Sequence, residues 1–287
     1  MTADLHTHST ASDGQYTPTE LVELAKSRGI QVLALTDHDT VDGLSEAVQA
    51  GKALGVRVLR GVELGAAEYS HLHILGYGFD PAGLLPLCQK LKAGRDERKY
   101  RILDFLAEQG LPLTLTEVEN VAGGDIIARP HFAQAMVRRG YVESNREAFD
   151  RYLDTDEYQR IERWKAGAPE CIAAIHDAGG KAVLAHPCQL GCSHGRLEEI
   201  LRALKDAGLD GIECFYPRHS PEQTAAYLRL ADKYGLHITG GSDFHGEAVR
   251  PDTFLTPIPL NLDWLGTFQN AQPHRNRLYQ SQIPHFR

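Results

Sequence analysis

The stretch Asp4-Leu5-His6-Thr7-His8-Ser9 closes a short segment, Ala3–His6, that has the pattern of a β-strand. Side chains two residues apart in a strand point to the same face, so His6 and His8 can approach one metal ion together. Two histidines at a strand end also occur on ordinary protein surfaces, and this pair alone is a weak signal. The pattern gains meaning because other parts of the chain repeat it.

Other predicted strand ends carry the same residue types. In a parallel barrel these ends converge on one face, where barrel enzymes hold their active sites. Glu63 could bridge two cations because a carboxylate has two oxygens. Asp37 would either orient a histidine ligand or cap its own turn, and spacing does not choose between His71 and His73 at the start of the fourth strand. The segments are Thr36-Asp37-His38-Asp39, Gly61-Val62-Glu63, His71-Leu72-His73, Ala185-His186-Pro187 and Gly241-Ser242-Asp243-Phe244-His245.

Apolar runs alternate with amphipathic stretches, which indicates β/α units and a largely parallel sheet. Thr17-Pro18-Thr19-Glu20, for example, predicts a helix start with a capping box. We expect an α/β fold, a barrel of seven strands with a small helical insertion. The expected strands are Ala3–His6, Val32–Thr36, Val56–Leu59, Leu72–Tyr77, Ala182–Ala185, Gly211–Phe215 and His237–Thr239.

The alternation stops in the middle of the chain, which suggests three parts. Residues 1–94 would form the first part of the barrel and residues 168–287 the second part. Residues 95–167 would form a helical insertion domain that covers the active site. The tail beyond Arg250 has no assignable pattern.

Composition narrows the class of protein. Hydrophobic residues make up 42% of the 287 residues and charged residues 24%, as in a globular protein with a real core. The formal net charge of −8 disfavours a broad nucleic-acid surface, so we expect no DNA partner. The five scattered cysteines favour a reducing compartment, and we see neither a signal peptide nor a membrane span. We therefore expect a cytoplasmic protein without a membrane partner, of open oligomeric state.

Basic side chains supply candidates for phosphate binding, because the guanidinium group offers a planar fork of donors to phosphate oxygens. Arg98, Lys99 and Arg101 place three cations within four residues, although a solvated helix face paired with Asp96 and Glu97 explains them equally well. Tyr100, Phe132, Phe215 and Tyr216 could stack on a base, but core packing is the better interpretation of each. The candidate substrate contacts are Asp13, His38, Arg98, Lys99, Arg101, Arg129, His131, Arg218 and His219.

Taken together, these motifs resemble the PHP (polymerase and histidinol phosphatase) family. They follow the family's order over almost the whole chain, and jointly they are highly specific. The resemblance implies a distorted (βα)7 barrel, the PHP fold, and a metal-dependent phosphoesterase. The matching pieces are Asp4–Ser9, Asp13-Gly14, Thr36-Asp37-His38, Gly61-Val62-Glu63, His73, Ala185-His186-Pro187 and Ser242-Asp243-Phe244-His245.

The resemblance also implies two or three divalent ions as cofactors. Imidazole and carboxylate ligands favour Mn²⁺, with Zn²⁺ or Fe²⁺ as alternatives. The family often has histidine where this chain has Asp13, which adds a negative ligand. Carried over onto this chain, the ligand sets are His6, His8, Glu63 and Asp243 for the first ion; Asp13, His38 and His245 for the second; and Glu63, His73 and His186 for the third, with Glu63 bridging.

Within the family, the closer resemblance is to the nucleoside 3′,5′-bisphosphate phosphatase branch. Ala128-Arg129-Pro130-His131-Phe132-Ala133 and Tyr216-Pro217-Arg218-His219-Ser220 carry it. It implies hydrolysis of the 3′-phosphate of a small nucleotide, such as adenosine 3′,5′-bisphosphate, to the 5′-monophosphate. The attacking group would be a metal-bound hydroxide, with no side-chain nucleophile. The alternatives are a 5′ to 3′ exoribonuclease on short RNA oligonucleotides, a histidinol-phosphate phosphatase, and a metal-binding module without turnover.

Overall fold

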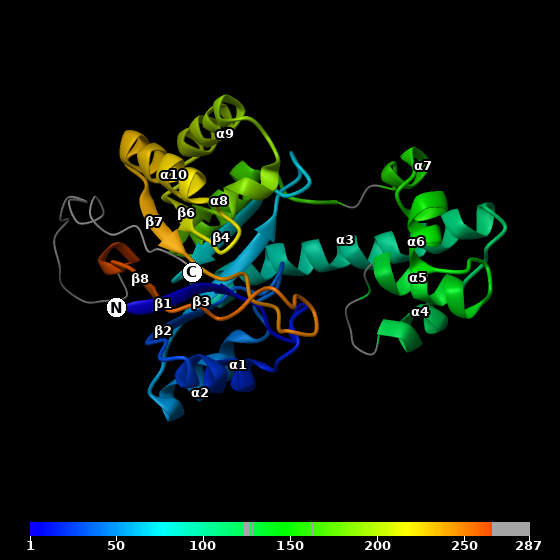
Figure 1. The fold of residues 1–287 in the computed structure, drawn as a ribbon, viewed down its shortest axis with the longest axis horizontal. Helices are drawn as coiled ribbons and strands as arrows, with labels where there is room; N and C mark the ends of the chain where they lie inside the picture. The colour runs from blue at the N-terminus through cyan, green and yellow to red at the C-terminus, as the bar shows by residue number, and fades with distance from the viewer. Residues whose placement is uncertain (123–126, 128, 162–163, 266–287) are drawn as a thin grey trace. The chain divides into compact units, whose positions relative to one another are not determined.

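The computed structural model describes residues 1–122, 127, 129–161 and 164–265 (Figure 1). The chain divides into two compact units. The barrel unit comprises Met1–Cys88 and Ala166–Arg287, and the helical unit comprises Gln89–Lys165. The domain limits expected from the sequence, and a covering role for the insertion, stay predictions.

The barrel unit is built on an eight-stranded sheet, which confirms the predicted barrel and adds one short strand. The added strand is β8, in the tail that had no assignable pattern, and it pairs antiparallel with β1. The end of the sheet after β7 returns to β1, because Asp243 N donates to His6 O and His8 N donates to Phe244 O. The order is β7-β6-β5-β4-β3-β2-β1-β8, with β1 Thr2–Thr7, β2 Val32–Leu35, β3 Arg57–Gly65, β4 His73–Tyr77, β5 Lys181–Leu184, β6 Gly211–Phe215, β7 His237–Gly240 and β8 Ile258–Pro259.

Strand β4 runs against both of its neighbours within the otherwise parallel run from β1 to β7, so its amino end lies beside the carboxyl end of β3. It pairs antiparallel with β3 and with β5, whereas β1–β2, β2–β3, β5–β6 and β6–β7 are parallel. His73, the first residue of β4, therefore lies opposite Gly65, the last residue of β3. Pairing with β4 also extends β3 beyond the predicted Leu59, so Glu63 lies within the strand.

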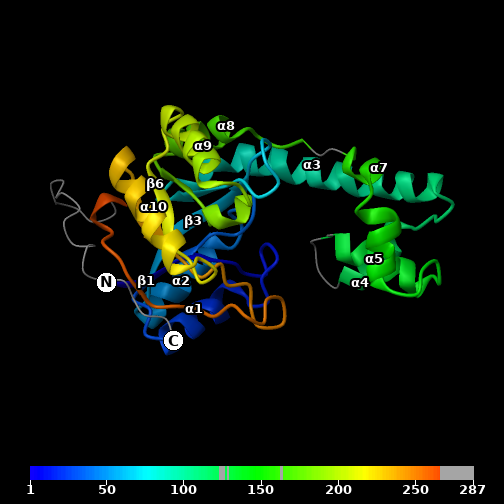
Figure 2. The ribbon, with the colours of Figure 1, turned by 45° about the horizontal axis from the view of Figure 1, so that its top comes forward.

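Five helices surround the barrel sheet (Figures 1 and 2). Helices α1 and α2 pack on each other and on β2 and β3, while α8 packs on β4 and β5, and α10 on β6 and β7. The predicted capping box opens α1, with Thr17 and Glu20 each bonding to the other's backbone. These helices are α1 Pro18–Ser27, α2 Leu44–Leu54, α8 Ala168–Asp177, α9 His194–Asp206 and α10 Pro221–Tyr234, with short 3₁₀ turns at Pro187–Leu190 and Asp263–Leu265.

The helical unit has a hydrophobic core of its own, which includes Leu106, Phe132, Met136 and Tyr158. Phe132 thus packs in the core, which was the better of its two interpretations. Helix α3 begins in the barrel unit and continues into the helical unit. The elements are α3 Pro81–Glu108, α4 Leu115–Ala122, α5 Arg129–Arg138, α6 Asn145–Ala148, a π-helix at Phe149–Leu153 and α7 Asp156–Gln159.

None of the helices among the described residues combines the length and the apolar character that crossing a membrane requires. The five cysteines are free thiols, and three of them, Cys88, Cys171 and Cys214, are buried.

Candidate functional site

A single buried carboxylate, that of Glu63 on β3, lies at the centre of the candidate site. Its Oε1 is 2.6 Å from His73 Nδ1 and 2.8 Å from His186 Nε2. Its Oε2 is 3.1 Å from His6 Nε2, 3.2 Å from His8 Nε2 and 3.2 Å from His38 Nδ1. The carboxylate thus contacts imidazoles from β1, from the segments after β2 and β5, and from the start of β4.

The Asp243 carboxylate, which follows β7, approaches the same histidines from another side. Its Oδ1 lies 3.5 Å from His6 Nε2, 3.3 Å from His8 Nε2 and 3.4 Å from His245 Nδ1. Its Oδ2 is held elsewhere, since it accepts from Tyr216 Oη at 3.2 Å and from Arg250 Nη1. One oxygen therefore faces the imidazoles while the other fixes the orientation of the carboxylate.

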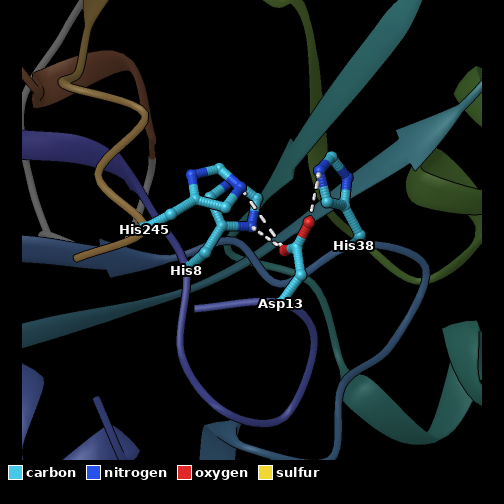
Figure 3. A group of neighbouring side chains, drawn as sticks. All are labelled: His8, Asp13, His38 and His245. Atoms are coloured by element: carbon cyan, nitrogen blue, oxygen red, sulfur yellow. Dashed lines mark ion pairs between the residues drawn. The ribbon is translucent and has the colours of Figure 1, made fainter. Parts of the chain in front are cut away.

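Asp13 closes the cluster on its more exposed side (Figure 3). Figure 3 shows it between His38 on one side and His8 and His245 on the other. Asp13 Oδ1 is 3.4 Å from His245 Nε2 and 3.8 Å from His8 Nδ1, and Oδ2 is 3.9 Å from His38 Nε2. The Asp13 side chain is 41% exposed, so a substrate can reach this part of the cluster.

All nine residues that the sequence nominated as metal ligands meet in this cluster. Three groups have ligand atoms within 4.8 Å of one another. One is the set predicted for the first ion, one is the predicted second set joined by His8, and one joins Glu63 and His73 to His38 in place of His186. The clusters suit more than one divalent ion, and the assignment of each ligand to an ion stays a prediction.

The electrostatics of the cluster attract positive charge. Burial opposes ionisation of Glu63, yet the imidazoles of His38, His6 and His73 hold its pKa well below the usual range. Burial lowers the pKa of His8, but the carboxylates of Asp243 and Glu63 outweigh burial and raise it to about 9. Burial lowers the pKa of His38 to about 3, and the neighbouring carboxylates of Glu63 and Asp13 oppose that shift.

Unpartnered buried atoms are a second observation that fits divalent metal ions bound by these residues. Buried polar atoms are normally hydrogen-bonded. Within the described part of the chain, however, several buried ligand atoms of this cluster have no hydrogen-bond partner, and a bound cation would satisfy them. These atoms are His6 Nε2, both ring nitrogens of His8, Glu63 Oε2 and His245 Nε2.

Local backbone geometry positions the ligands. His186 and Asp243 have φ values of 22° and 55°, and Asp39, next to His38, has 52°. Non-glycine residues avoid this left-handed region at a cost of about 1–3 kcal/mol each, and such strain gathers at functional sites. Gly241 allows β7 to approach β1, because a Cβ there would lie 2.3 Å from the Cβ of His6.

Asp37 holds the loop that carries Asp13, which neither of its two predicted roles stated. It accepts from Ser9 N and Ser9 Oγ, both at 2.7 Å, and from Ser12 Oγ at 2.6 Å. The carboxylate thus fixes the loop after β1, and not its own turn or a histidine ligand.

Sequence reasoning missed two charged residues that touch the cluster. Glu213 lies in the buried strand Gly211–Phe215, with Oε1 3.2 Å from His6 Nδ1, and it accepts from His186 N at 2.7 Å. A lone carboxylate within an otherwise apolar strand is the signal that could have found it. Arg250 lies in the segment after β7, and no sequence pattern marks it.

The predicted substrate contacts outside the cluster have local partners. Arg129 Nη1 pairs with Asp154 Oδ1 at 2.8 Å, and Lys99 Nζ pairs with Asp96 Oδ1 at 2.6 Å. His219 Nδ1 lies 3.1 Å from Cys214 O. Arg101 pairs with Glu97, and Arg98 Nε donates to Ile161 O. Arg218 is exposed and His131 is half-buried. Ala128, which belongs to the predicted motif, lies outside the described residues.

The aromatic residues that could either stack on a base or pack in the core differ in their exposure. Phe215 and Tyr216 are buried, whereas Tyr100 is 54% exposed. Packing therefore accounts for Phe215 and Tyr216, in addition to Phe132.

Comparisons with known proteins identify a matching family and several similar chains. The PHP domain family model matches residues 4–238. A 5′-3′ exoribonuclease from Haemophilus influenzae is 37% identical over 245 residues, which cover 84% of this chain and 89% of the relative. A 3′,5′-nucleoside bisphosphate phosphatase from Chromobacterium violaceum is 35% identical over 262 residues, covering 89% and 92%. The solved structure of an amidohydrolase from Chromobacterium violaceum, with bound sulfate and no metal, has a TM-score of 0.75 at 32% identity and covers 91% of this chain and 93% of that one.

Proposed function

This chain belongs to the PHP domain family of metal-dependent phosphoesterases, and from that membership we propose that it removes the 3′-phosphate from nucleoside 3′,5′-bisphosphates. The observation that carries the proposal is the buried Glu63 carboxylate shared by five imidazoles, an arrangement suited to several cations at one phosphate. The relative from Chromobacterium violaceum supports the choice of substrate.

Glu63, Asp243, Asp13 and the six histidines of the cluster would hold two or three divalent ions, with Mn²⁺ as the proposed metal. Such ions lower the pKa of a water molecule and neutralise phosphoryl oxygens. The protein's own groups orient the ligands, through Arg250 and Tyr216 on Asp243 and through Asp37 on the Asp13 loop. The exposed side of Asp13 and His38 would receive the phosphate that reacts.

The phosphate that does not react needs a second set of cations, and Arg98 and Arg129 are the candidates that we propose. Arg98 and Arg129 both lie near Tyr158, where burial raises the pKa of the phenol and the two guanidinium groups oppose that shift. The Tyr158 hydroxyl is buried without a hydrogen-bond partner among the described residues. Contacts to a non-reacting phosphate hold a substrate in place and can lower the barrier of the chemical step.

A second candidate function is exoribonuclease activity on short 5′-phosphorylated RNA. The relative from Haemophilus influenzae, matched over 84% of this chain, favours it. Both reactions would use the same metal cluster, so the difference lies in what binds beyond the reacting phosphate.

A substrate panel separates these functions. Phosphate or nucleotide release with Mn²⁺ would be compared for adenosine 3′,5′-bisphosphate, adenosine 3′-monophosphate, histidinol phosphate and a short 5′-phosphorylated RNA. We expect the highest kcat/KM for the bisphosphate, by about 100-fold over the 3′-monophosphate, because only the bisphosphate carries the second, non-reacting phosphate. Equal values for the 3′-monophosphate and the bisphosphate would contradict the proposal, and a preference for RNA would support the second candidate.

A further inference from the structure

Glu213 is a buried carboxylate on β6 that contacts two of the cluster histidines, His6 through its ring Nδ1 and His186 through its backbone N–H. Its side chain is fully buried, and its strand otherwise contributes Ile212, Cys214 and Phe215 to the core. We propose that Glu213 is a positioning residue that fixes the ring of His6 and the backbone of His186 for metal binding. This inference rests on the proposed metal cluster and not on the choice of substrate.

The contact with His6 determines which ring nitrogen is available to a metal ion. His6 Nδ1 lies 3.2 Å from Glu213 Oε1 and 3.4 Å from Oε2. With a carboxylate as the acceptor, the hydrogen bond favours the tautomer in which Nδ1 carries the proton. The other nitrogen, Nε2, faces Glu63 and Asp243 and keeps its lone pair for an ion, the arrangement usual for metal-binding histidines.

The contact with His186 stabilises an unfavourable backbone conformation. His186 has φ 22° and ψ 62° and lies two residues after the end of β5, directly before Pro187. Its N–H donates to Glu213 Oε2 at 2.7 Å, and its ring Nε2 reaches Glu63 Oε1 at 2.8 Å. The same carboxylate therefore holds ligands from two separate strands, one through its ring and one through its main chain.

The substitution Glu213→Gln tests this role because it keeps the size of the side chain and removes one acceptor. If the amide nitrogen faced His186 N, two donors would meet. If it faced His6 Nδ1, that nitrogen would have to accept, the proton would move to Nε2, and Nε2 could not bind an ion. Either orientation weakens the metal cluster.

We expect Glu213→Gln to weaken Mn²⁺ binding by about 10- to 100-fold, as measured by titration of metal-free protein. Excess Mn²⁺ should restore most of kcat, and the unfolding temperature of the metal-free variant should stay within a few degrees of the parent, about 3 °C. Glu199→Gln, an exposed and ion-paired site on α9, is the matched control and should leave Mn²⁺ affinity unchanged.

Glu213→Asp keeps a carboxylate on a shorter side chain and covers the case in which the glutamine variant does not fold. We expect its Mn²⁺ affinity to lie between those of the parent and the glutamine variant. Unchanged Mn²⁺ affinity in a folded variant would overturn the proposal, as would a loss of thermal stability without a change in affinity. A change in substrate preference alone, with normal metal binding, would bear on the proposed function and would also count against Glu213 as a metal-positioning residue.

Discussion

The barrel cluster and the cations of the helical unit differ in how their side chains are used. In the barrel unit, buried imidazoles and carboxylates from distant segments contact one another, and Glu63 alone contacts five rings. In the helical unit, cations pair with acids nearby in the chain, as the 18% exposed Lys99 does with Asp96 and the 52% exposed Arg101 with Glu97. An exposed pair such as Arg101 and Glu97 contributes little to stability, so its cation can exchange partners. The buried cluster and the exposed pairs thus differ in how firmly their charged groups are held.

The largest expected effect is that of Glu63→Gln in the barrel cluster. The amide cannot serve all five imidazoles, and the bridging negative charge is lost. We expect kcat/KM to fall by about 1,000-fold or more, with a loss of bound metal. Metal analysis and phosphate release measure both, with Glu23→Gln on α1 as an exposed control. A Glu63→Gln variant with full metal content and parental activity would contradict the claim that the barrel cluster depends on the Glu63 carboxylate.

Arg129→Ala tests the helical unit. If Arg129 exchanges Asp154 for the non-reacting phosphate, KM for adenosine 3′,5′-bisphosphate should rise about 10- to 100-fold, with a small change for adenosine 3′-monophosphate. Arg139→Ala is the matched control, since Arg139 is 50% exposed and paired with Glu117, against 44% for Arg129. Equal KM values for the parent and Arg129→Ala would remove the helical unit from the substrate site.

The smallest expected effect concerns a polar network in the barrel unit away from the cluster. Asp210 accepts from Ala182 N at 2.9 Å and Lys181 Nζ at 3.0 Å and lies 2.7 Å from His176 Nε2. Burial would raise the pKa of Asp210, but these hydrogen bonds outweigh burial and lower it. Asp210→Asn should reduce the free energy of unfolding by about 1 kcal/mol at pH 7 and leave kcat unchanged.

The pH dependence of that effect has a definite sign. Because the folded-state pKa of Asp210 is lowered, its contribution is complete above the ordinary aspartate value of about 4 and is lost as the pH falls through the folded-state pKa. Denaturant unfolding at several pH values should show the parent and the variant converging below about pH 4. A difference that persists or grows in acid would exclude the ionised carboxylate as its source.

Strand-end positions made much of the cluster predictable. His6, His8, His186 and Asp243 stand at or just beyond strand ends, and the sequence shows both the strands and the residue types. The contribution of His73 was not derivable from spacing, because it depends on β4 running antiparallel to β3. Glu63 was expected after its strand, but pairing with β4 extends β3 past it. In each case the missing information was a pairing between strands, which local pattern does not encode.

Glu213 shows a second limit. Its role depends on β6 lying beside β5, so that one carboxylate reaches His186 as well as His6 of β1. No spacing rule links these three positions in the chain. The ion pairs of Lys99 and Arg101 were easier to foresee, because Asp96 and Glu97 lie three and four residues away on the same helix.

The positive φ angles of His186 and Asp243 also bear on protein engineering. Glycine adopts that geometry without steric strain, so a glycine at either position would relieve the local backbone strain. Here the same change would delete an imidazole or a carboxylate from the cluster. At these two positions, a change that favours thermal stability would therefore reduce activity. Variants selected for thermal stability alone would keep the fold and lose the activity of the cluster.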